Sequence, residues 1–106
     1  MTINYGFAKF FNVLDAALVS SVSLQERLAG IVSGVSHLKR DSFPDDETWK
    51  RFEELMRSTT NRPAEGHEGT IAATTSRMNE NDTRHWIGEA FGIFSRIAEA
   101  CGKTRQ

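Results

Sequence analysis

Residues 85–101, HWIGEAFGIFSRIAEAC, form the stretch of this sequence that decides the fold. Its apolar residues recur every three or four positions and are Trp86, Ile87, Ala90, Phe91, Phe94, Ile97, Ala98 and Cys101. Glu89, Arg96 and Glu99 fall on the opposite side, and Gly102 supplies a stop signal. This period is that of an α-helix, and so wide an apolar stripe predicts a helix packed into a protein core.

Two further helices are predicted before it, over residues 5–20 and 24–38. The first carries a helical stripe of Phe7, Phe10, Phe11, Leu14 and Leu18, and the second carries Leu24, Leu28, Ile31, Val35 and Leu38. Ser23 and Glu26 match a capping box, in which each side chain bonds a backbone amide at the helix start. Because the connection is so short, the two helices are expected to form an antiparallel hairpin.

A third helix is predicted from Pro44, which is followed by acidic residues in the first turn. Its buried edge is predicted to consist of Trp49, Phe52, Leu55 and Met56. The other side carries acid-before-base pairs four residues apart, Asp46 with Lys50, Glu47 with Arg51 and Glu53 with Arg57. Such pairs are typical of a solvated helix face.

The segment from Ser58 to Met78 differs from the rest because it is polar and lacks a core stripe. Residues 58–69 are predicted to be a loop, and residues 70–78 a short helix, with a strand through Thr70-Ile71-Ala72 left open as an alternative. Long polar connections in small domains often carry function. We therefore expect a partner-binding surface here, with contacts from Arg62, His67, Glu68 and Arg77, and the competing view is a solvated loop without a task.

Length and composition fit one domain over residues 1–106. The 106 residues are 39% hydrophobic and 25% charged, with a formal net charge of -1. These values exclude a disordered or collagen-like chain. The fold class expected is all-α, a small helical bundle of four to five helices with an N-terminal antiparallel hairpin.

The cytoplasm is the compartment that the sequence favours. The only cysteine, Cys101, cannot form an internal disulfide, and its place on the apolar stripe favours a buried, inert thiol. The first residues lack the basic region of a signal peptide, and no stretch has the roughly 18 uncharged apolar residues of a membrane span.

The sequence contains no catalytic motif, so an enzyme is not expected. Neither a cofactor nor a metal is expected, although His67 lies between Glu65 and Glu68 and His85 follows later. The function favoured is a protein-interaction or regulatory module. The alternative is a nucleic-acid-associated regulator with Arg57, Arg62, Arg77 and Arg84 as phosphate contacts, although the near-neutral charge makes nucleic acid an unlikely partner.

Those four arginines have a simpler interpretation, because Glu65, Glu68, Glu80 and Asp82 could neutralise them within the chain. The glycines are equally open to two interpretations. Gly30 with Gly34 and Gly88 with Gly92 have the GxxxG spacing that lets helices approach closely, within the chain or in a homodimer. They could also simply relieve crowding beside large aromatic side chains.

Overall fold

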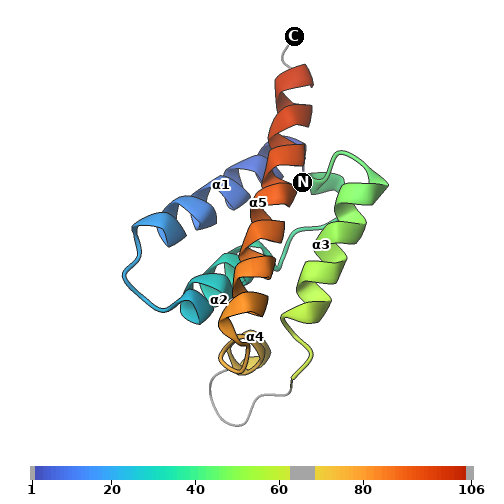
Figure 1. Ribbon diagram of the computed structural model, residues 1–106. Coiled ribbons are helices and arrows are strands. Elements are labelled where there is room, and N and C mark those ends of the chain that lie inside the picture. Colours follow the sequence, from blue (N-terminus) through green and yellow to red (C-terminus); the bar gives the residue numbers. More distant parts are fainter. Residues whose placement is uncertain (1, 63–68, 105–106) are drawn as a thin grey trace.

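The computed structural model describes residues 2–62 and 69–104, and within these it confirms the all-α prediction (Figure 1). The elements are α1 (Ile3–Val19), α2 (Leu24–Val35), the 3-10 helix η1 (Arg40–Ser42), α3 (Asp46–Ser58), α4 (Gly69–Thr75) and α5 (Glu80–Thr104). The helix predicted from residues 85–101 lies within α5, which has 25 residues. It begins several residues earlier than the apolar stripe because Asn79 caps it, its Oδ1 accepting from Asp82 N–H at 2.7 Å.

α5 is the element around which the others pack, with contacts to α1, α2 and α3 (Figure 1). α1 and α2 contact each other directly as the predicted hairpin, and α4 packs against α2 beside the start of α5. The predicted capping box is present, since Ser23 Oγ accepts from Glu26 N–H at 3.1 Å. None of the helices in the described ranges combines the length and the apolar character needed to cross a membrane.

The core lies where α1, α2, α3 and α5 meet. Its fully buried large side chains include Phe10, Leu28, Ile31, Val32, Val35, Leu55, Ile93 and Ile97. Phe10 makes edge-on ring contacts with Phe43 at 6.4 Å and with Phe52 at 6.2 Å between centroids. These aromatic contacts join α1 to α3 and to the segment before it.

The predicted apolar stripes were too wide, and some of their residues are exposed. Phe91 was predicted to be buried but is 37% exposed, and Phe11 and Leu18 are 50% and 71% exposed. These residues are exposed because of the way in which α1 and α5 are turned relative to the core. Phe10 on α1 and Ile93 on α5 point into the core, so residues at the edge of each stripe remain at the surface. Ile93, which the predicted stripe left out, is fully buried.

α3 begins two residues later than predicted. Pro44 was predicted at the first helical position but lies before the N-cap, which is Asp45. Asp45 Oδ1 accepts from Thr48 N–H at 2.8 Å and from the Thr48 hydroxyl at 2.7 Å. Thr48 is fully buried, and its Oγ1 accepts a bond from Arg96 Nε at 2.8 Å. The cap of α3 is thereby attached to α5. These bonds lower the pKa of Asp45, chiefly because the Thr48 hydroxyl and amide stabilise its carboxylate.

The charged face of α3 is not simply solvated, as the spacing had predicted. Arg51 pairs with Glu89 of α5 at 2.8 Å instead of with Glu47, and both side chains are only about one-third exposed. Glu47 instead pairs with Arg96 of α5 at 3.2 Å. The prediction considered α3 alone, whereas Arg51 and Glu47 lie against α5 and find their partners there.

Candidate partner-binding site

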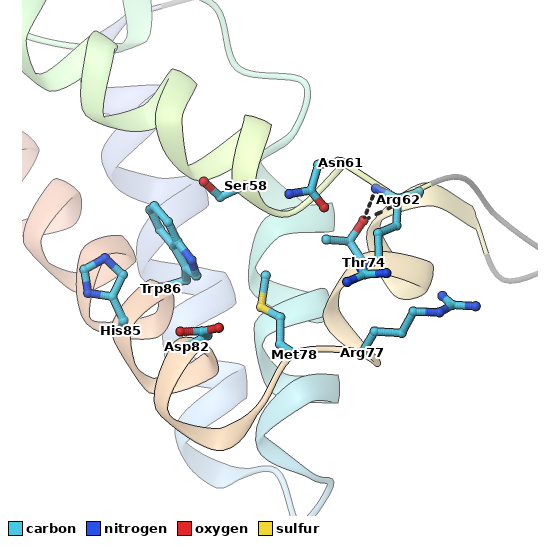
Figure 2. Close-up of a pocket in the computed structure, with 9 residues that line it drawn as sticks. All are labelled: Ser58, Asn61, Arg62, Thr74, Arg77, Met78, Asp82, His85 and Trp86. Carbon is cyan, nitrogen blue, oxygen red and sulfur yellow. Dashed lines mark hydrogen bonds between the residues drawn. The ribbon is translucent and has the colours of Figure 1, made fainter.

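Two of the predicted site residues, Arg62 and Arg77, line one cavity of about 380 Å³ (Figure 2). The lining residues are Ser58, Asn61, Arg62, Thr74, Arg77, Met78, Asp82, His85 and Trp86. They come from the end of α3, from α4 and the turn after it, and from the first turns of α5. The segment predicted to be functional therefore forms a hollow together with the start of the strongest helix.

Thr74 fixes the arginine wall of the cavity. Its Oγ1 accepts from the Arg62 backbone N–H at 3.0 Å (Figure 2). The Thr74 hydroxyl donates to the Thr70 carbonyl at 2.8 Å. Thr74 is buried, so these bonds are shielded from water. They hold the chain after α3 beside α4, which places the Arg62 side chain at the cavity.

Arg77 reaches the same cavity from the residues that follow α4. One of its guanidinium nitrogens donates to the Ala73 carbonyl, which directs the side chain back along α4. The next residue, Met78, is tied to α2, because Gln25 Nε2 donates to the Met78 carbonyl at 3.2 Å. The turn that presents Arg77 is therefore anchored to the bundle.

Asp82, His85 and Trp86 form the other wall, from the first turns of α5 (Figure 2). The His85 and Trp86 rings meet edge-on, with centroids 4.7 Å apart. Trp86 is half-buried and packs against the core. Within the described residues, the Asp82 carboxylate has no ion-pair partner, so it is available to a cationic or N–H group. This wall was not predicted to be part of a site, although the spacing of its residues places them on adjoining turns of one helix.

The other candidate residues are not part of this cavity. His67 and Glu68, together with Glu65, lie outside the described residues. Arg57 pairs with Glu54 at 2.5 Å, and Arg84 pairs with Glu80 at 2.7 Å. Two of the four arginines proposed for phosphate binding are thus neutralised on their own helices. The Arg84 pair is one of the internal pairs that the sequence suggested.

Each glycine pair has one member that is closely packed within the chain. A Cβ on Gly34 of α2 would overlap the Val13 side chain of α1, and one on Gly92 of α5 would lie 2.6 Å from the Arg51 guanidinium. Gly30 and Gly88 face open space, with no atom within 4 Å of an added Cβ. Close packing within the chain therefore explains Gly34 and Gly92. Of the four glycines, only Gly30 and Gly88 have space for a contact with a second copy.

In the part of the chain that the structure describes, no three histidine, cysteine or acidic side chains come together as a metal site requires. The sequence matches no known family model, and no similar curated protein or solved structure was found. The functional argument therefore rests on the geometry of this chain.

Proposed function

We propose that this protein is a small non-catalytic interaction module that binds a segment of a partner protein in the cavity between α4 and the start of α5. The observation that carries the proposal is the convergence of Arg62 and Arg77 with Asp82 and Trp86 around one cavity of about 380 Å³. Four side chains with three types of recognition group, guanidinium, carboxylate and indole, thus line a single cavity.

The chemistry of the two walls favours an acidic peptide segment. Arginine guanidinium groups bind carboxylates through paired, charge-assisted hydrogen bonds. Trp86 and Met78 offer apolar surface to the body of a side chain, and Asp82 accepts from a backbone N–H or a cationic group. The volume lies at the lower end of the roughly 300–1,000 Å³ typical of ligand pockets. A loop that presents an Asp or Glu side chain fits both the size and the charge.

Binding without catalysis is supported by the role of the serine in this cavity. Ser58 and His85 both line it, and a nucleophilic serine would need a bond to a base. Ser58 Oγ instead donates to Glu54 Oε1 at 3.4 Å, on its own helix. A cytoplasmic location belongs to the same proposal, and the single buried cysteine, Cys101, supports it.

Nucleic acid is the less favoured partner. Phosphate binding draws its affinity from several unpaired cations on one face. Arg57 and Arg84 are held by Glu54 and Glu80, and the net charge is -1. The proposed binding of an acidic protein segment uses Arg62 and Arg77 together with the apolar surface of Trp86.

The test is affinity capture from an extract of the source cells with two matched double variants. Arg62→Ala/Arg77→Ala removes two charges at the cavity, and Arg57→Ala/Arg84→Ala removes two charges elsewhere. Proteins captured by the wild type should be lost with the first variant and retained with the second, while both variants keep the helical circular dichroism signal. Equal loss with both variants would overturn the cavity as the site. Salt-dependent binding of labelled DNA by the wild type, weakened by both variants, would favour the nucleic-acid alternative.

A further inference from the structure

A second surface of the molecule is apolar and lies on α1 and α5. Phe11, Leu18 and Phe91 are exposed there by 50%, 71% and 37%, and we call them the α1–α5 face. Their rings and side chains adjoin Phe94, whose centroid is 6.4 Å from that of Phe11. Contiguous exposed apolar surface of this kind marks an interaction site in most small domains. None of these residues lines the Arg62–Arg77 cavity.

Two small hollows border the α1–α5 face, and Leu18 and Phe91 line both of them. The first, of about 130 Å³, also contains Phe11, Asp15 and Phe94. The second, of about 120 Å³, also contains Leu24, Arg27 and Ile87. Both are smaller than the roughly 300–1,000 Å³ of a small-molecule pocket, so single side chains of another protein are the occupants that fit.

The two hollows carry opposite charges. Asp15 borders the first and Arg27 the second, and within the described ranges neither takes part in an ion pair. Arg27 Nη2 donates to the Ser20 carbonyl at 2.8 Å, but its Nε is buried without an acceptor.

We infer that the α1–α5 face binds a second copy of this chain, in a two-fold symmetric dimer. Across the α1–α5 face, Asp15 lies on one side of the apolar ridge that Leu18 and Phe91 form, and Arg27 lies on the other side. A two-fold rotation reverses this order, so Asp15 of each copy meets Arg27 of the other. The face is therefore complementary to itself in charge, and the exposed Leu18 has a hollow of the second copy to enter. This dimer rests on apolar and charged side chains rather than on the glycines, and it is independent of the proposed function.

The charges give a direct test by sedimentation equilibrium. Asp15→Arg and Arg27→Asp each place like charges opposite one another in a symmetric dimer, so each variant alone should dimerise roughly tenfold or more weakly than the wild type. Mixed together, the two variants carry opposite charges at both contacts and should form a heterodimer. A mixture that stays as weakly associated as its components would overturn the proposed pairing.

A second pair of variants keeps the test decisive if a charge change harms folding. Leu18→Glu should abolish the dimer, because it places a carboxylate on the ridge. Val19→Glu is the matched control, because Val19 is 82% exposed and lines neither hollow. It should leave the dimer unchanged. A wild-type protein that remains monomeric at every concentration measured, or equal effects of the two glutamate variants, would overturn the inference.

Discussion

The two sides of α5 use opposite means of packing, and each leaves a different type of surface. Toward α3 the contacts include two ion pairs between helices, Arg51 with Glu89 and Arg96 with Glu47. Toward α1 the contacts are aromatic, and the ring centroids of Phe7 and Phe94 are 5.2 Å apart. The polar side ends in a cavity with groups of both charges, and the apolar side ends in an exposed ridge. One helix thus separates a surface suited to a foreign partner from one suited to a second copy.

The largest expected difference in stability is between a substitution in the buried core and one on the exposed α1–α5 face. Phe10→Ala should lower the free energy of unfolding by about 3–5 kcal/mol, because Phe10 is fully buried against two other rings. Phe91→Ala should cost only about 1 kcal/mol, because Phe91 is partly exposed. Denaturant unfolding is measured with Leu18→Glu present in every protein, so that monomers are compared. Equal costs for the two variants would contradict the assignment of Phe91 to the surface.

The second effect concerns the glycines on α2. Gly34→Ala should destabilise the protein by about 1–3 kcal/mol, because the new Cβ would overlap Val13. Gly30→Ala faces open space and should stabilise it by up to about 1 kcal/mol through better helix propensity. Thermal melts of both variants show whether each substitution raises or lowers the melting temperature. A stabilising Gly34→Ala would show that α1 and α2 do not approach closely at this point.

A smaller difference in stability is expected between the loss of an ion pair that joins two helices and the loss of one within a single helix. Glu89→Gln should cost about 0.5–1 kcal/mol, because the pair with Arg51 joins two helices and is partly shielded from water. Glu54→Gln removes a more exposed pair within α3 and should cost less than about 0.5 kcal/mol. Denaturant midpoints at low salt measure both. The reverse order would mean that the Arg51–Glu89 contact does not hold α3 to α5.

The smallest effect is the pH dependence due to Asp45. Its pKa is lowered from 3.8 in the folded state, so the unfolded chain binds the proton more readily. The carboxylate therefore contributes stability above about pH 4, and this contribution is lost as the pH falls through the folded pKa. Asp45→Asn should flatten the loss of stability below pH 4, measured by melts at several pH values. Asp82→Asn is the control, and an equal change there would contradict the role of the cap.

Much of the fold could be predicted because helix periodicity and capping are local. The Ser23 capping box, the hairpin and the long final helix follow from residues close together in the sequence, and the structure confirms them. The exposure of Phe91 and the burial of Ile93 could not be predicted. Phe91 belongs to the predicted apolar stripe and Ile93 lies beside it, and only the position of α1 decides which of them faces the core.

The candidate site was predictable in part for the same reason. Arg62 and Arg77 stood out because they lie within a polar segment that has no core stripe. The opposite wall of Asp82, His85 and Trp86 was not assigned, because only the packing of α4 beside α5 brings it to the arginines. The partners of Arg51 and Arg96 also lie on other helices, beyond the reach of spacing rules for a single helix.

Site-specific photocrosslinking can show whether a partner binds in the cavity. A photoreactive amino acid replaces Asn61, which lines the cavity but is not one of the proposed binding groups, or, as the control, Arg57 on α3. Each protein is irradiated in an extract of the source cells. We expect a discrete crosslinked partner from position 61, attached through an acidic segment, and no such product from position 57. The same crosslinked products from both positions, or a product from position 57 alone, would contradict binding in the cavity.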